Sequence, residues 1–154
     1  MNRSGFSLIE LVVILLIITA LLYIAIPQFG SMTRKYNIER QTRQLYADMM
    51  TARSRAMNTN RTHILTATAS AYSIVDDKNS NGAVDAGEIV IQSTLSYPVT
   101  WGTGVTINFN GRGIPDVTGM INTTASTEAA FDCIEVQMTK LYIGKMAGGT
   151  CVHK

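Results

Sequence analysis

The chain has 154 residues, with 13 Lys and Arg against 11 Asp and Glu, and a formal net charge of +2 at pH 7. A net charge this small gives no reason to expect nucleic acid or an acidic surface as a partner. Once a short leader and an apolar segment near the amino terminus are set aside, about 125 residues remain, which suits one domain with its own core.

The amino terminus changes abruptly from a polar leader to an apolar run. Residues 1–5, MNRSG, contain Arg3, whereas residues 6–26 contain only three polar side chains, those of Ser7, Glu10 and Thr19. As a helix, the run would cover about 30 Å, the thickness of the hydrocarbon core of a bilayer. A carboxylate in such a helix costs about 2.5–3.5 kcal/mol at the centre and less near an end. We therefore predict a membrane-spanning helix over residues 6–27, in which Glu10 either caps the helix end or lies at the interface, or meets a charged partner.

The segment GFSLIELVVILLIITALLYIAIPQF resembles the start of type IV pilin-like proteins, which include the pilins and the pseudopilins of type II secretion. This resemblance implies that residues 1–5 are a leader, which a prepilin peptidase removes by cutting after Gly5. It also implies that the new amino terminus, Phe6, is N-methylated. Phe6 and Glu10 would then carry assembly, because the carboxylate can neutralise the amino terminus of a neighbouring subunit in an apolar filament core. Pro27, where many relatives carry a proline, should loosen or kink the helix.

An ordinary secretory signal is the alternative for this segment, since such signals also begin with basic residues and continue as an apolar run. The run lacks a clear small-x-small cleavage site at its end and is longer than the usual apolar region of about 7–15 residues. Arg34, Lys35, Arg40 and Arg43 follow the run, and a positive-inside count would place the carboxyl terminus in the cytoplasm. The leader motif and the cysteines favour the opposite topology, a single pass through a bacterial inner membrane with the head outside the cytoplasm.

A second helical pattern follows over residues 28–60. Its apolar face contains Ile38, Leu45, Met49, Ala52 and Ala56, spaced by seven, four, three and four residues. This spacing predicts an amphipathic helix whose basic residues lie largely on other faces. The segment LYADMMTARSRAMNTNRTHIL also resembles the region of GspH/FimT-type minor pilins and pseudopilins in which the helix leads into the first strand.

From His63 onward the sequence contains short strand-like runs, namely THILTATA, AYSIV, EIVIQST, VTINF, CIEVQM and KLYIGKM. They predict an antiparallel sheet over residues 61–154, with the amphipathic helix packed on it. The expected architecture is α+β, and the resemblance implies the pilin fold. Phe109 to Pro115 forms a Gly-rich loop without phosphate-binding spacing. We expect the Thr-, Ala- and Asn-rich residues 116–128 to form an exposed loop.

Residues 77–88, DKNSNGAVDAGE, match the spacing of a twelve-residue calcium loop. Oxygen-bearing side chains at positions one, three, five and nine, a glycine at six and a glutamate at twelve are the groups that wrap Ca²⁺. The predicted ligands are the side chains of Asp77, Asn79, Asn81, Asp85 and Glu88 and the carbonyl of Ala83. Because strand-like runs flank the loop, we expect a stiffened hairpin with weak affinity, of about 10⁻⁴ to 10⁻³ M. The alternative is a plain hairpin turn at Asn81-Gly82.

The chain has two cysteines, Cys133 and Cys151, both near the carboxyl terminus. A pair of cysteines in an exported domain suggests a disulfide. Two free buried thiols are the alternative.

These patterns favour a structural subunit of a type IV pilus or type II secretion pseudopilus, with a minor pilin or pseudopilin preferred over a major pilin. The expected partners are other pilin or pseudopilin subunits, the prepilin peptidase and an inner-membrane assembly platform. After extraction from the membrane, the subunit would reside in a periplasmic or extracellular filament. We expect no enzymatic activity, because His63 lies in a strand pattern, His153 lies in the tail and no nucleophile motif is present.

A DNA-binding minor pilin for DNA uptake and a major pilin or adhesin are the alternative functions. Some relatives bind DNA through a basic Gly-Arg-x-Arg turn late in the head. The corresponding stretch, Gly144 to Ala147, lacks the second basic residue, which disfavours DNA as a partner.

Overall fold

The computed structural model describes residues 7–101, 106–124 and 128–153, with the backbone alone for residues 25–28 and 86. The elements, in chain order, are helix α1 (Leu8–Thr59), strands β1 (His63–Ala67) and β2 (Ala71–Asp76), the 3₁₀ turn η1 (Ala86–Glu88), and strands β3 (Ile89–Thr94), β4 (Val99–Trp101), β5 (Thr106–Phe109), β6 (Gly119–Thr123), β7 (Cys133–Val136), β8 (Leu141–Ala147) and β9 (Thr150–His153). The predicted α+β class, with a long amino-terminal helix and antiparallel sheets, is confirmed. The chain divides into two units, residues 1–34 and 35–154, and α1 contributes to both.

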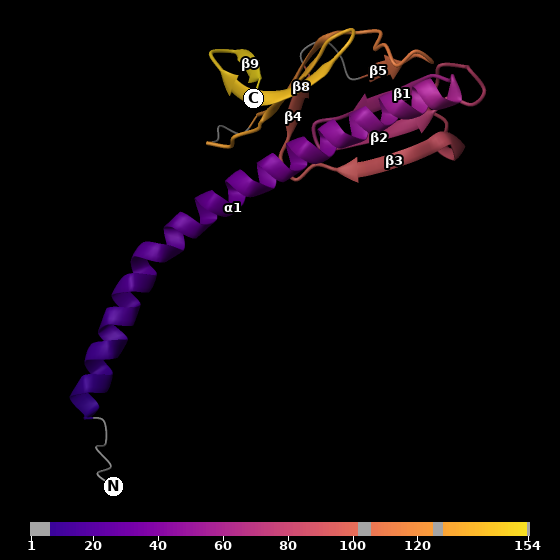
Figure 1. Cartoon of the computed structure of the whole chain (residues 1–154). Helices are drawn as coiled ribbons and strands as arrows, with labels where there is room; N and C mark the ends of the chain where they lie inside the picture. The colour runs from indigo at the N-terminus through magenta and orange to yellow at the C-terminus, as the bar shows by residue number, and fades with distance from the viewer. Residues whose placement is uncertain (1–6, 102–105, 125–127, 154) are drawn as a thin grey trace. The chain divides into compact units, whose positions relative to one another are not determined.

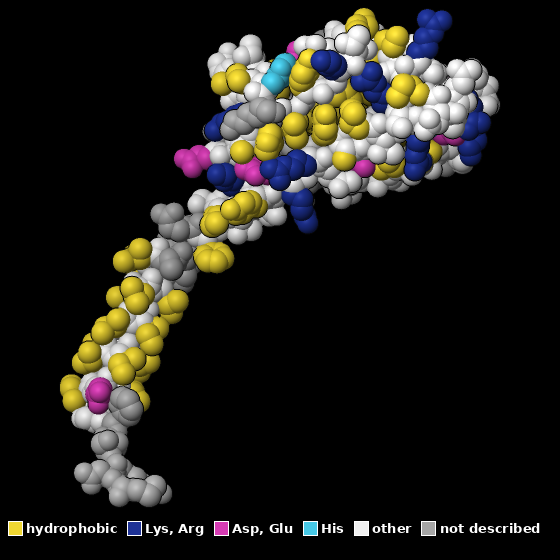
Figure 2. Space-filling view, viewed as in Figure 1, with side chains coloured by type: hydrophobic (Ala, Val, Ile, Leu, Met, Phe, Trp, Pro, Cys, Tyr) yellow, Lys and Arg dark blue, Asp and Glu magenta, His cyan; other side chains and the backbone are white. Residues whose placement is uncertain are grey.

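In the first unit, α1 is apolar on all sides. Every described side chain from Leu8 to Ile24 is exposed, and nearly all are aliphatic. Hydrophobic side chains cover the visible face of this part of the helix (Figure 2). By length and composition the helix can cross a membrane. Helical structure continues through position 27, so the proline predicted to loosen the helix does not end it.

In the second unit, α1 packs one face against the sheets. The five apolar residues predicted for that face, Ile38, Leu45, Met49, Ala52 and Ala56, are each at most 2% exposed. They pack as the period of the helix requires, because positions three, four and seven apart share one side. Most of them join a core with side chains from both sheets, including Leu65, Ile74, Phe109, Ile134 and Val136. Figure 1 shows this part of α1 lying along β1 and β2.

The head contains two antiparallel sheets where the sequence predicted one. The first has the strand order β3-β2-β1-β5, and the second has the order β4-β6-β7-β8-β9. Strands β4, β6 and β9 were not predicted, since they are short, with three to five residues each. The expectation of an exposed loop over residues 116–128 is wrong for Gly119–Thr123, which form β6. Ile121 and Thr123 alternate with less buried neighbours and point into the core, which stabilises this short strand.

A buried polar contact joins α1 to the first sheet. The Tyr72 hydroxyl on β2 donates a hydrogen bond to Asp48 Oδ2 on the helix, and Gln44 Nε2 donates to Asp48 Oδ1 at 3.1 Å. Tyr72 is 3% exposed and Asp48 is 9% exposed. Burial, together with the bond to Asp48, raises the pKa of Tyr72 well above its usual value. The contact therefore holds the helix in a defined position on the sheet while the aromatic ring contributes to the core.

We predict that Tyr72→Phe destabilises the head by about 1.5–3 kcal/mol, the range for a hydrogen bond to a charged group. The ring stays in the core, but the buried Asp48 carboxylate loses a donor. Chemical denaturation in detergent should show a lower midpoint. Tyr36→Phe is the matched control, since Tyr36 lies on α1, as Asp48 does, but is 55% exposed. Equal midpoints for the two variants would contradict this role for the Tyr72 hydroxyl.

Candidate functional site

The amino-terminal candidate site centres on Glu10. Gly5 and Phe6, the predicted processing and methylation residues, lie outside the described residues. Glu10 is exposed in the first turn of α1, where its amide donates to the Ser7 carbonyl at 3.1 Å. An acidic side chain in the first turn suits the positive end of the helix dipole. No side chain in the described part of the chain bonds to the Glu10 carboxylate, so it is available to a group on another molecule.

The other polar side chain of the apolar helix behaves differently. The Thr19 hydroxyl donates to the Leu16 carbonyl at 2.9 Å, one turn earlier in the same helix. A hydroxyl satisfied in this way is compatible with apolar surroundings. Glu10 is therefore the one described side chain between Leu8 and Ile24 whose charge calls for an external partner.

The second candidate site is the loop at residues 77–88, which connects β2 to β3. These strands are antiparallel neighbours, with Ala71 opposite Thr94 and Val75 opposite Ile89, so the loop closes a hairpin. The first half of the loop is wound around Asp77. Asp77 Oδ1 accepts a hydrogen bond from the backbone amide of Asn81 at 3.1 Å, and Asp77 Oδ2 accepts one from the backbone amide of Gly82 at 3.0 Å. Gly82 has φ of +71°, a conformation that favours glycine at the sharp turn.

The predicted amide ligands are held in the same half of the loop. Asn79 Oδ1 accepts a hydrogen bond from the backbone amide of Asn81 at 2.9 Å, and Asn81 Oδ1 accepts one from the backbone amide of Ala83 at 2.7 Å. Each carbonyl oxygen has a second lone pair, so these bonds leave room for another partner. The side-chain amides of Asn79 and Asn81 both donate to Asp85 Oδ2 at 2.9 Å. These bonds, first that from Asn79 and then that from Asn81, lower the pKa of Asp85.

Glu88 returns from the end of the loop to its beginning. The Lys78 amide donates to Glu88 Oε1 at 3.0 Å, whereas Glu88 Oε2 is buried without a hydrogen-bond partner in the described structure. The neighbouring Asp76 carboxylate is already bound by Arg61 at 2.8 and 3.0 Å. In the described residues, no three His, Cys, Asp or Glu side chains lie close enough to share a metal ion. Asp77 and Glu88 are therefore buried at the base of the loop, whereas Asp85 is hydrogen-bonded to the side-chain amides of Asn79 and Asn81.

Strands β7, β8 and β9 carry the disulfide. Cys133 on β7 and Cys151 on β9 are bonded, although β8 lies between their strands. The intervening strand contributes Gly144, which lies opposite Cys133 in the register. A Cβ atom at Gly144 would lie 2.2 Å from the Val152 carbonyl oxygen and 3.1 Å from Cys151 Sγ. Glycine at this position therefore allows the β9 backbone to approach β8 closely, and it also leaves room for the crosslink.

The stretch Gly144 to Ala147, matched in the sequence to a DNA-binding turn, lies within β8 and is not a turn. Its residues pair with β9, where Lys145 lies opposite Val152 and Ala147 lies opposite Thr150. The turn itself is formed by Gly148 and Gly149, both with positive φ. The expected correspondence of Gly144 to Ala147 to the DNA-binding turn is therefore wrong, because the turn lies at Gly148 and Gly149, which have no basic side chain.

One cluster in this sheet was missed by the sequence reading. His153 on β9 bonds to Glu135 on β7 and stacks on Tyr142 of β8, with ring centroids 4.0 Å apart. Hydrogen bonds from Gln137 and then from His153 lower the pKa of Glu135. No local motif could indicate this cluster, since it depends on the register of three strands.

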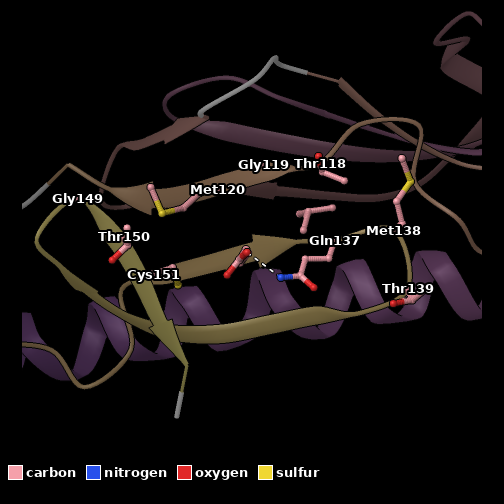
Figure 3. Close-up of a pocket in the computed structure, with 11 residues that line it drawn as sticks. Thr118, Gly119, Met120, Gln137, Met138, Thr139, Gly149, Thr150 and Cys151 are labelled. Atoms are coloured by element: carbon pink, nitrogen blue, oxygen red, sulfur yellow. Dashed lines mark hydrogen bonds between the residues drawn. The ribbon is translucent and has the colours of Figure 1, made fainter.

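A groove of about 620 Å³ lies beside the same strands. Figure 3 shows Met120, Thr150 and Cys151 towards the left of the view and Gln137, Met138 and Thr139 towards the right. The ionisable side chain in its described lining is Glu135, which already bonds to Gln137 and His153. The groove therefore presents thioether, hydroxyl and backbone groups, which form no catalytic constellation.

Comparison with protein families gave a match over residues 41–139 to the model described as type II transport protein GspH. The chain belongs to this family. The match covers well over half of the chain, from the helix of the head to β7 and the turn that follows it, and begins after the apolar segment. GspH proteins are membrane-anchored pseudopilins that interact with other pseudopilin subunits, and their role is structural rather than catalytic. Comparisons with curated proteins and with solved structures gave no match.

Proposed function

We propose that this GspH-family chain is a minor subunit of a type II secretion pseudopilus or type IV pilus, assembled into a helical filament through α1. The observation that carries the proposal is the helix from Leu8 to Ile24, apolar on every side and carrying one carboxylate. A helix of this kind is stable in a lipid bilayer or among other apolar helices. Attached to a pseudopilin head, it suits transfer from a membrane to a filament core.

Glu10 supplies the directional contact in this proposal. Cleavage after Gly5 by a prepilin peptidase creates a positively charged amino terminus at Phe6, which is N-methylated. In a filament, the Glu10 carboxylate of one subunit neutralises that amino terminus on a neighbour. The attraction between the two charges is strong in apolar surroundings, because the dielectric constant there is low, and either charge would be costly to bury without its partner.

We place the head outside the cytoplasm, with a single pass of α1 through a bacterial inner membrane and an assembly platform that extracts the subunit. Support comes from the disulfide between Cys133 and Cys151, because disulfides persist in oxidising compartments. DNA is not proposed as a partner, because the stretch matched to a basic turn is a paired strand.

Processing gives a direct test of this proposal. We expect chains recovered from the filament fraction to begin at Phe6 and to carry the mass of one additional methyl group, as measured by intact-mass spectrometry. Gly5→Val should leave the chain in the membrane fraction at its full, unmethylated mass. Gly30→Ala is the matched control, since a Cβ there meets nothing within 4 Å. A full-length chain in wild-type filaments would overturn the processing step.

A further inference from the structure

We propose that residues 77–88 bind one calcium ion, which clamps the turn between β2 and β3. This inference does not depend on the filament role, because it concerns the head alone. The loop has the residue types and spacing that wrap Ca²⁺, but that pattern by itself also fits a plain turn. The structure adds an observation that a plain turn does not explain.

That observation is the free oxygen of Glu88. The residue is 8% exposed, and its Oε2 is buried without a hydrogen-bond partner in the described structure. An ionised carboxylate oxygen without a partner is costly to bury. Its other oxygen accepts from the Lys78 amide, which directs the carboxylate back across the base of the loop. The last residue of a calcium loop uses both carboxylate oxygens, so the free Oε2 is positioned as a ligand.

Asp77 is a second buried carboxylate of the loop, and it can accept a cation in addition to its hydrogen bonds. It is 3% exposed, and each of its oxygens accepts one backbone amide of the loop. A carboxylate oxygen can accept more than one bond, so both retain capacity for a cation. In the described residues no Lys or Arg side chain pairs with Asp77, Asp85 or Glu88, and the nearby Arg61 is bound to Asp76. With Lys78, these three carboxylates leave a local charge that one divalent cation neutralises.

The donor set selects calcium over other cations. All the predicted ligands are oxygens, from carboxylates, side-chain amides and the Ala83 carbonyl, and Ca²⁺ accepts six to eight such ligands in flexible geometry. Mg²⁺ is smaller, demands near-ideal octahedral geometry and gives up its waters reluctantly, so we expect it to bind this loop more weakly than Ca²⁺. Thiolate and imidazole, the ligands that transition metals prefer, are absent from residues 77–88.

Binding requires a rearrangement in one half of the loop. Asp77 and Glu88 are already buried at its base, whereas Asp85 Oδ2 is held by the amides of Asn79 and Asn81. Calcium would take the place of these amide donors and draw Asp85 inward. The energy used in this exchange places the affinity in the weak extracellular range, with Kd of about 10⁻⁴ to 10⁻³ M.

Calorimetry and thermal unfolding of the full chain in detergent test the proposal. We expect one saturable site when CaCl₂ is raised to about 10 mM, with an increase in Tm of roughly 5 °C. Mg²⁺ at the same concentration should give a much smaller shift. Glu88→Gln, which keeps the size and the Oε1 acceptor, and Asp85→Asn should each weaken binding by about tenfold or more, since calcium affinity depends on the number of charged ligands.

Glu128→Gln is the matched control, because Glu128 is an exposed carboxylate of the head outside the loop and its loss should leave the calcium titration unchanged. Circular dichroism will show whether each variant folds. If Glu88→Gln does not fold, Asp85→Asn decides, since Asp85 is part-exposed on the loop. Absence of saturable binding by the wild type, or wild-type affinity in the folded variants, overturns the proposal.

Discussion

Glu10→Ala is expected to leave the chain inserted and processed in the membrane and to reduce its incorporation into filaments by about tenfold or more. Removal of one partner from a charge pair in apolar surroundings costs about 3–5 kcal/mol, because the other charge remains buried. In the membrane the same change removes a cost, since the helix loses its carboxylate. The substitution therefore separates insertion from assembly. Quantitative immunoblots of membrane and sheared filament fractions would measure the two amounts.

Two further variants identify the group responsible. Glu10→Gln keeps the size and hydrogen-bonding capacity of the side chain but removes the charge, so it should behave like alanine if the carboxylate pairs with an amino terminus. Thr19→Ala is the control, because the Thr19 hydroxyl is bonded within its own helix at 2.9 Å. Normal filament content in Glu10→Gln would contradict the charge-pair role and leave a steric or hydrogen-bonding role for this position.

Loss of the disulfide is expected to have the largest effect on the stability of the head. The bond closes a chain segment with a sequence separation of 18, and a loop of this length contributes about 3 kcal/mol in the chain-entropy model. The double variant Cys133→Ala, Cys151→Ala should therefore unfold at a Tm lower by roughly 10 °C. Differential scanning calorimetry in detergent measures this change.

The wild-type chain treated with a reducing agent provides the control. Its Tm should fall close to that of the double variant, which itself should not respond to the reductant. Equal Tm values for oxidised and reduced wild type would show that the crosslink does not stabilise the native head.

The parts of the fold that sequence reasoning predicted are those with a strong repeating pattern. Ile38 to Ala56 recur at helical spacing, and this face is buried as predicted. Residues 77–88 were predicted to be a loop between two strands, which the structure confirms, because their turn residues lie within one segment; their calcium ligands remain a prediction. Neither feature depends on what the rest of the chain does, which is why each was visible in the sequence.

The parts that sequence reasoning missed depend on contacts between distant segments. β6 has five residues, and its Ile121 and Thr123 become core residues only because β4 and β7 lie on either side of it. The contact of His153 with Glu135 and Tyr142 requires three strands in register, and so does the need for glycine at position 144. The free oxygen of Glu88 was equally invisible, since burial of that oxygen is a property of the folded hairpin.

The uniform apolar surface of α1 from Leu8 to Ile24 has a consequence for how subunits recognise one another. Two smooth apolar helices can slide or rotate against each other with little change in buried area, so their packing contains little information about alignment. In the proposed filament, the single carboxylate of each helix sets the axial offset between neighbouring subunits. A lone polar residue sets the register of a coiled coil in the same way. Any subunit with a carboxylate at the same position in its helix can then join the same filament, and contacts between the heads determine which subunits are neighbours.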